Sequence, residues 1–386
     1  MRHAALILGG GPAGAAAAIT LARAGARPLL IERTRDTGDA LCGGFLSWRT
    51  LTALARLGVD ADALNPARIT RVRIFARGRM VEAALPAPAI GVSRRRLDTL
   101  LLRYAAACGA MVERGQAARA VAQGVVRTGD GATLTAAALF LASGKHDVRG
   151  LARPGDARGG DPALGIRTRR GPNAALTRMI GDAIELHLFD RGYAGVVVQE
   201  DGSANICLAV RRSRLAEAGD PARLLAALAQ EAPALGERLA AGAAGPVEAI
   251  ANVPYGWRAR HGADGLYRLG DQAAVIPSLA GEGMGIALAS GASAAQAWLR
   301  DGVAGAPGWQ VRFAAQAARP LAIAGMVRSI AERPGLCAPL LRLAARSGLI
   351  DAVAMATRIA HPARSSTLTA DMDESSGDRR ADVGLT

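Results

Sequence analysis

The chain has 386 residues, of which 50% are hydrophobic and 21% are charged, so its composition excludes a mainly disordered protein. At roughly 150 residues per domain, this length corresponds to two or three domains. The formal net charge of +14 comes from 47 basic residues, which are all arginine except Lys145 and are spread through nearly every segment. Nucleic-acid binders gather their charge on one face, so this spread argues against a nucleic-acid surface.

Export, membrane-spanning and metal-binding features are missing from the sequence pattern. There is no run of 18 apolar residues, and the first residues lead into a glycine turn without the features of a signal peptide. We therefore expect a cytoplasmic protein. The four cysteines lie far apart, and the histidines have no ligand spacing with them or with each other. The sequence thus predicts neither a disulfide framework nor a metal site.

The first predicted elements form a βαβ unit. An apolar run at 4–8 predicts a strand, a glycine turn follows at 9–14, and 15–24 has the composition of a helix. A second apolar run at 28–31 ends at Glu32 and predicts the next strand. Parallel strands need such a crossover helix, so the sequence predicts an α/β fold from its beginning.

The turn at 9–14 fits the dinucleotide fingerprint Gly-x-Gly-x-x-Gly. The first glycine allows a tight turn, the second lets a pyrophosphate approach the backbone, and the third permits close helix–strand packing. The helix N-terminus suits an anion, and the acidic residue that ends the next strand suits a ribose. The fingerprint does not separate FAD from NAD. The candidate cofactor-binding residues are Gly9, Gly11, Pro12, Ala13, Gly14, Glu32 and Arg33.

The middle of the chain alternates between helical and strand-like segments. Helical spacing occurs at 47–57 and 96–108, with short strands at 69–86 between them. Residues 112–135 predict a small antiparallel meander that leads into a strand at 137–142. A second, antiparallel domain is predicted from strands at 163–169, 183–189, 194–199 and 204–210, with a hairpin turn at 200–203.

The last third is predicted to be mostly helical. After a helical segment at 221–240 and a short strand at 266–269, a helix at 283–299 should return the chain to the first domain. Amphipathic helices at 320–330, 336–345 and 349–360 pack on the nucleotide-binding domain, cover a substrate cavity or lie on a membrane interface. Residues 362–386 are polar and predict a disordered tail.

A segment at 270–285 decides between FAD and NAD. It resembles the Gly-Asp motif of FAD-dependent oxidoreductases with the para-hydroxybenzoate hydroxylase-type fold. This resemblance implies that Asp271 binds the ribityl chain and that the helix beginning at Gly283, Met284 and Gly285 lies at the flavin ring edge. The chemistry agrees, because a helix N-terminus stabilises negative charge on a reduced flavin. An ordinary helix-opening loop is the alternative.

A third segment, Ser-Arg-Arg-Arg-Leu-Asp at 93–98, resembles the Arg-x-x-Leu-Asp segment of the same family. The resemblance implies that Arg94 approaches the FAD, and a guanidinium fork suits a phosphate because it donates two parallel hydrogen bonds. The alternative is a solvated arginine run at the start of a helix.

The turn Leu-Cys-Gly-Gly at 41–44 most resembles the geranylgeranyl reductase-like branch of this superfamily, where such a turn lies beside the flavin ring. The resemblance makes Cys42 and Gly43 candidate cofactor-binding residues. Two departures stand out. The aromatic Tyr-x-Trp-x-Phe-Pro pattern of the branch is missing after Tyr193, and Ser143 replaces the aspartate of an Ala-Asp-Gly motif, which argues against direct use of NADPH.

Two further residues are candidates for chemistry. Cys42 is the candidate catalytic residue, as a redox or flavin-tuning thiol, with a small buried hydrophobic residue as the alternative. Lys145 stands in Lys-His-Asp after a predicted strand end, where α/β sites form. We expect these three residues to form a surface turn. Residues 252–257 lack the Trp-x-Trp-x-Ile-Pro signature of tryptophan halogenases, which argues against halogenation.

The sequence as a whole predicts a Rossmann-like FAD/NAD(P)-binding domain, an antiparallel-sheet substrate domain and C-terminal helices. The predicted FAD-binding domain comprises 1–160 and 262–305, the substrate domain 161–261, the C-terminal helices 306–361, and the disordered tail 362–386.

The expected function is FAD-dependent hydride transfer to or from an apolar, unsaturated molecule of isoprenoid or polyketide type. A monooxygenase using NAD(P)H and O2 is the alternative, and an arginine-rich nucleic-acid binder is a distant one. The expected partners are a small apolar substrate and an electron donor, either NADPH or a redox protein, with peripheral membrane contact left open.

Overall fold

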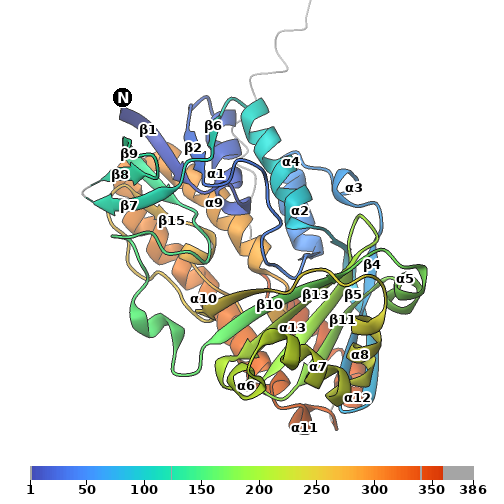
Figure 1. The fold of residues 1–386 in the computed structure, drawn as a ribbon. Helices are drawn as coiled ribbons and strands as arrows, with labels where there is room; N and C mark the ends of the chain where they lie inside the picture. Colours follow the sequence, from blue (N-terminus) through green and yellow to red (C-terminus); the bar gives the residue numbers. More distant parts are fainter. Residues whose placement is uncertain (1, 123, 340, 360–386) are drawn as a thin grey trace, which may run out of the picture.

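The computed structural model describes residues 2–122, 124–339 and 341–359, which fold around two β-sheets (Figure 1). The predicted disordered tail, 362–386, lies outside the described residues. The strand order is β6-β2-β1-β9-β8-β7 in the first sheet, with β15 also paired to β9. The order in the second sheet is β14-β10-β13-β12-β11-β4-β5-β3. Both the α/β class and the antiparallel character of most of the second sheet were predicted.

The first sheet combines a parallel part with an antiparallel extension. Strand β1 pairs in parallel with β2 and β9, and Leu6 lies opposite Leu29 in the register. Strands β7, β8 and β9 form the predicted antiparallel meander. The strands of this sheet are β1 (Arg2–Leu8), β2 (Leu29–Glu32), β6 (Met111–Arg114), β7 (Ala118–Ala122), β8 (Val125–Thr128), β9 (Thr133–Leu141) and β15 (Leu266–Arg268).

Helices α1 (Pro12–Arg23), α4 (Arg94–Ala107) and α9 (Gly283–Asp301) cover one face of this sheet. Side chains alternate along β1, so Ile7 joins the helical core while Leu6 and Leu8 join the core on the opposite face. A Cβ atom at Gly291 of α9 would lie 2.1 Å from the carbonyl oxygen of Ala13, so glycine allows α9 to pack directly on α1. The helix predicted at 283–299 therefore does return the chain to the first domain.

The second sheet is antiparallel except where β4 pairs in parallel with β11. Its strands are β3 (Phe45–Leu46), β4 (Ile69–Ala76), β5 (Arg79–Gly91), β10 (Ala163–Arg170), β11 (Ala183–Phe189), β12 (Gly192–Val198), β13 (Ala204–Arg211) and β14 (Glu248–Val253). Strands β3 to β5 thus belong to this sheet, although the division drawn from the sequence put them in the FAD-binding part. The domain boundaries themselves stay a prediction.

Helices α5 (Ala174–Ile180), α7 (Pro221–Glu231) and α8 (Pro233–Ala240) pack on the outer face of the second sheet, beside α6 (Arg212–Ala218) (Figure 1). A buried carboxylate on that face is fully paired, because both oxygens of Glu185 accept from Arg238, at 2.8 and 2.9 Å. Helices α2 (Trp48–Arg56) and α3 (Ala61–Leu64) connect β3 to β4.

The C-terminal helices pack against the inner face of the second sheet. They are α10 (Gly305–Ala331), α11 (Pro334–Cys337), α12 (Leu341–Arg346) and α13 (Leu349–Ala356). We expected a helix to begin at Pro320, but α10 begins at Gly305 and continues through it. Pro320 is buried, so packing of its ring offsets the loss of one helical hydrogen bond. No helix within the described ranges is long and apolar enough to cross a bilayer.

Candidate functional site

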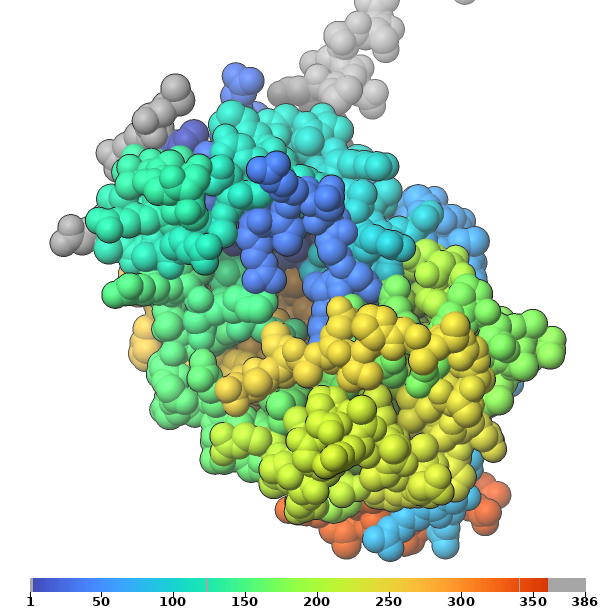
Figure 2. Space-filling model, viewed as in Figure 1, coloured from blue at the N-terminus to red at the C-terminus, as the bar shows by residue number. Residues whose placement is uncertain are grey.

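A cavity of about 1180 Å³ lies between the two sheets and the C-terminal helices. Figure 2 shows the molecule hollowed between the blue segment near the N-terminus and the gold segment that contains β14. Small-molecule pockets commonly measure about 300–1000 Å³, so this cavity has room for more than one small ligand. Both sheets and the loop 37–44 contribute to its wall.

The N-terminus of α1 forms one end of the cavity. Gly9 has φ +111°, and a Cβ atom there would lie 2.4 Å from the carbonyl oxygen of Ala142. No side chain caps α1, and Gly11, Pro12 and Ala13 line the cavity. The first-turn amides therefore face an open space that suits an anion. Gly14 does not line the cavity. It has a packing role, because a Cβ atom there would lie 2.0 Å from the carbonyl oxygen of Gly9.

Glu32 and Arg33 line the same end of the cavity. Oε2 of Glu32 accepts from the amide of Gly10 at 2.7 Å, and Oε1 accepts from the amide and the hydroxyl of Thr34 at 3.0 and 2.9 Å. The Glu32 carboxylate thus fixes the glycine turn. Glu32 also stands at the position where the fingerprint predicts an acidic residue that binds a ribose. Nη2 of Arg33 lies 3.1 Å from Nε2 of His146.

Arg94 lines the cavity, but its guanidinium fork faces a neighbour on its own helix. Nε and Nη2 donate to the two carboxylate oxygens of Asp98, at 2.9 and 2.7 Å. Burial opposes the charge of Arg94, yet the paired carboxylate raises its pKa above the ordinary value. The fork predicted for a phosphate is therefore engaged by Asp98, because residues four apart on a helix lie side by side.

Asp271, in the short turn η2 (Gly270–Gln272), lies near the N-terminus of α9 on the cavity wall. Gly283 and Met284 line the cavity, and no side chain caps α9, so a second helix N-terminus faces the same space. Gly285 does not line it. A Cβ atom at Gly285 would lie 2.4 Å from Oε1 of Glu282, so this glycine makes room for a buried carboxyl.

Lys145 is placed differently from our expectation of a surface turn. It lines the cavity together with His146 and Asp147, and its Nζ donates to Oδ2 of Asp271 at 3.0 Å. The sequence signal for a functional site at Lys145 was the strand end just before it, since loops after parallel strands gather at one edge of the sheet. The partner could not be seen because Asp271 follows much later in the chain.

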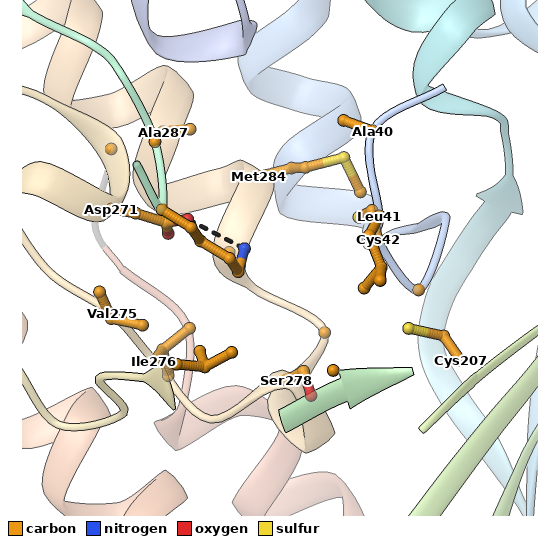
Figure 3. Close-up of a pocket in the computed structure, with 18 of the residues that line it drawn as sticks. Ala40, Leu41, Cys42, Cys207, Asp271, Val275, Ile276, Ser278, Met284 and Ala287 are labelled. Atoms are coloured by element: carbon orange, nitrogen blue, oxygen red, sulfur yellow. Dashed lines mark hydrogen bonds and ion pairs between the residues drawn. The ribbon is translucent and has the colours of Figure 1, made fainter. Parts of the chain in front are cut away.

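Cys42 and Cys207 both line the cavity, from the loop 37–44 and from β13 (Figure 3). Burial raises the pKa of Cys207 to about 12, so its thiol stays protonated at neutral pH. Nδ2 of Asn205 donates to the carbonyl oxygens of Cys42 and Gly43, at 3.0 and 2.9 Å, which fixes this loop. A catalytic role for Cys42 stays a prediction.

A cluster of hydroxyl groups on the cavity wall was missed by the sequence reasoning. Tyr193 and Tyr255 each form a hydrogen bond with Oγ of Ser278, at 2.7 and 2.8 Å. The amide of Leu279 donates to the Tyr193 hydroxyl at 2.8 Å. Burial raises the pKa of both phenols, so they remain protonated donors. Isolated serine and tyrosine residues carry no local pattern that could have indicated the cluster.

The donor set of the cavity fits FAD. Two uncapped helix N-termini, at Gly11 and Gly283, offer amides to anionic groups, and the turn at Gly9 allows close approach of a diphosphate. The carboxylates of Glu32 and Asp271 are acceptors for sugar or ribityl hydroxyls. The residues predicted to bind the cofactor all line the cavity, except Gly14 and Gly285, which support the two helix starts.

The sequence comparisons agree with this site. Residues 2–149 match the FAD binding domain family. Menaquinone reductases of Mycobacterium tuberculosis and Mycolicibacterium smegmatis are 33% and 30% identical over 121 and 156 residues. These matches span 30% and 38% of the relatives' own length. A digeranylgeranylglycerophospholipid reductase of Methanopyrus kandleri is 28% identical over 325 residues, which are 75% of each chain.

Solved structures share the fold. A geranylgeranyl bacteriochlorophyll reductase-like protein from Thermoplasma acidophilum matches with a TM-score of 0.71 at 18% identity, over 89% of this chain and 91% of that one. PqsL of Pseudomonas aeruginosa, described as a probable FAD-dependent monooxygenase, matches with a TM-score of 0.67 at 17% identity, over 89% and 100%. Residues 2–149 therefore form an FAD-binding domain, and FAD is the cofactor of this chain.

Proposed function

We propose that the protein is an FAD-dependent reductase or dehydrogenase of an apolar, unsaturated substrate of isoprenoid type. One observation carries this proposal: the cavity continues beyond the predicted cofactor-binding residues into a compartment with aliphatic walls. The sheet side of this compartment consists of Val72, Ile74, Leu85, Ile184, Leu186 and Leu188. The helix side consists of Met326, Val327, Ile330, Leu341, Leu349, Ile350 and Val353.

This compartment suits a flexible hydrocarbon chain. Aliphatic side chains exclude water and contribute about 25 cal/mol for each Å² of apolar surface that a substrate buries. FAD, when bound, supplies or accepts the hydride of the reaction. The hydroxyls of Tyr193, Tyr255 and Ser278 line the cavity. Tyr255 donates to Ser278 and a second hydrogen bond joins Ser278 to Tyr193, which leaves one proton, on Tyr193 or Ser278, to donate to a polar end of the substrate. The names of the curated relatives, reductases of menaquinone and of a digeranylgeranyl lipid, support the same substrate class.

The direct test is a single-turnover reduction. The FAD-loaded protein is reduced with dithionite under argon and mixed with menaquinone or a geranylgeranyl lipid, and products are identified by mass spectrometry. We expect the oxidised flavin absorbance to return as the substrate gains two hydrogen atoms. If reduced FAD persists with every isoprenoid offered, the proposal fails.

Gly195 provides a test of the compartment itself. This residue lines the cavity, and the nearest atom to an added Cβ, the carbonyl oxygen of Cys207, would lie 3.8 Å away. Gly195 also takes the place of the tryptophan in the aromatic pattern that follows Tyr193 in the resembled branch. Gly195→Leu should therefore fold, keep its affinity for FAD, and lower kcat/KM for an isoprenoid at least about tenfold. Unchanged turnover would place the substrate elsewhere.

A monooxygenase is the second candidate, because the PqsL fold match covers 89% of this chain. It predicts that NADPH bleaches the flavin and that oxygen uptake accompanies a hydroxylated product. The electron donor is part of the same test. If NADPH does not reduce the flavin while dithionite does, a redox protein is the donor, in line with Ser143.

We also propose a cytoplasmic protein with peripheral membrane contact and without nucleic-acid binding. The free thiols Cys42, Cys108, Cys207 and Cys337 suit a reducing compartment. Nucleic-acid binding would appear as affinity that falls steeply with salt, and we expect none at moderate ionic strength.

A further inference from the structure

Lys145 is the only lysine of the chain, and its ammonium lies inside the cofactor cavity. The side chains of Lys145 and Asp271 are 30% and 21% exposed, and this exposure faces the cavity. An ion pair on an open surface contributes little because water screens it. A bound cofactor excludes that water, so each charge of the pair acts more strongly on its surroundings.

The buried side chains of Arg153 and Gln272 hold the Lys145–Asp271 pair in place. Nη1 of Arg153 donates to the carbonyl oxygen of Asp271 at 2.9 Å, and Nη2 donates to that of Lys145 at 2.6 Å. Nε2 of Gln272 donates to the carbonyl oxygens of Gly144 and His146, at 2.9 and 3.0 Å. Two loops that lie far apart in the sequence are therefore cross-linked, and the ammonium has a defined place.

The charge of Lys145 acts on other residues that line the cavity. Asp271 raises the pKa of Lys145, which keeps the amine protonated. Burial raises the pKa of Tyr255 and of Cys207, and the Lys145 ammonium opposes both rises. The guanidinium fork of Arg94, by contrast, is paired with Asp98 on its own helix, so its charge is neutralised by that carboxylate.

We propose that Lys145 stabilises the two-electron-reduced form of bound FAD relative to the oxidised form, and that Asp271 limits this effect by offsetting the charge. Reduction adds electron density to the flavin ring, and a fixed cation in a water-excluded site lowers the free energy of that density. Lys145 is thus a residue that sets the reduction potential. The inference depends on FAD as the cofactor but not on the identity of the substrate.

The test measures the midpoint potential of bound FAD, by equilibration with a reference dye in the presence of excess FAD. Lys145→Met should lower the potential by at least about 30 mV, which is a tenfold loss of preference for the reduced form. Lys145→Arg should stay close to the wild type. Asp271→Asn should shift the potential in the opposite direction, because it leaves the ammonium unpaired. Arg103→Met, which removes an exposed surface charge, is the matched control.

Equal potentials in the wild type, Lys145→Met and Asp271→Asn would overturn the inference. A shift of the same sign in both variants would also overturn it, since that is the result of a merely distorted site. If Lys145→Met does not bind FAD, the midpoint potentials of Lys145→Arg and Asp271→Asn test the proposal instead. The proposal then fails if the potential of Asp271→Asn is no higher than that of the wild type. No step uses substrate turnover, so failure of the reductase proposal is seen separately.

Discussion

Glu282 is a fully buried carboxyl immediately before α9, whose N-terminus faces the cavity. Its Oε2 accepts from the Ser47 hydroxyl at 3.1 Å and lies 3.3 Å from Nη1 of Arg358. Oε1 has no hydrogen-bond partner among the described residues. Burial raises the pKa of Glu282 to about 7, and the Arg358 charge offsets only part of that rise. This carboxyl therefore changes charge near neutral pH.

We predict a pH-dependent contribution of Glu282 to stability. Between its ordinary pKa of 4.5 and the folded value of about 7, the folded chain binds the proton more tightly than the unfolded chain. The stability from Glu282 is therefore complete below pH 4.5 and is lost as the pH rises to about 7. Relative to Glu282→Gln, which is neutral throughout, the wild type should lose on the order of 3 kcal/mol of unfolding free energy across this window. Urea denaturation at several pH values measures the difference, and parallel pH profiles would contradict the prediction.

At the scale of elements, strand β13 of the second sheet holds the loop 37–44, which lines the cavity, in place. Asn205 is fully buried, and its amide donates to two carbonyl oxygens of the Cys-Gly-Gly turn. The turn is further confined because a Cβ atom at Gly44, where φ is +73°, would lie 2.5 Å from Nε2 of Gln199. The position of Cys42 and Gly43 thus depends on a strand far along the chain.

Replacement of Asn205 should loosen this turn. Asn205→Ala leaves two partly buried carbonyl oxygens without this donor, which costs up to about 1–3 kcal/mol. Asn205→Asp should cost more, because it places a carboxylate against those oxygens. We expect FAD to bind more weakly in the order wild type, Ala, Asp, as measured by quenching of flavin fluorescence. Equal affinities in all three proteins would show that the turn is held by other contacts.

The elements that the sequence predicted depend on residues close together in the chain. The turn at 9–14 requires glycine for its own backbone geometry, and the short strands predicted at 69–86 correspond to β4 and the first part of β5. Pairing partners are different, because nothing within β4 specifies that it joins β11 across more than a hundred residues. The same limit explains Lys145, whose partner Asp271 comes from a distant loop. Sequence patterns thus predicted residues that line one cavity, and the low aromatic content predicted an aliphatic pocket, whereas the hydroxyl cluster and the place of the aliphatic compartment required the folded chain.

At the scale of the whole molecule, the C-terminal helices and the turn between β4 and β5 form a surface that exposes apolar and basic side chains, and some of these residues also line the cavity. Helices α12 and α13 contact β5 and each other, α10 contacts α11 and α13, and α11 contacts β4. The exposed apolar side chains of this surface are Met80, Met326, Ile330, Leu336, Leu343, Leu349 and Met355. Its exposed arginines are Arg77, Arg79, Arg333, Arg342 and Arg346. Because Met326, Ile330 and Leu349 also line the cavity, an apolar substrate could pass from this surface into the compartment without crossing bulk water.

This surface suits an anionic lipid membrane, since its apolar side chains can enter the acyl boundary while its arginines meet the headgroups. We predict that the protein sediments with phosphatidylglycerol vesicles and much less with phosphatidylcholine vesicles. Leu336 and Leu343 are 64% and 66% exposed and do not line the cavity, so the double variant Leu336→Glu, Leu343→Glu should abolish sedimentation without changing FAD affinity. Val311→Glu, at an equally apolar position that is 53% exposed on the first half of α10, is the control and should still sediment. Binding that survives the double variant would mean that the substrate reaches the cavity from solution, or that the membrane contacts another face.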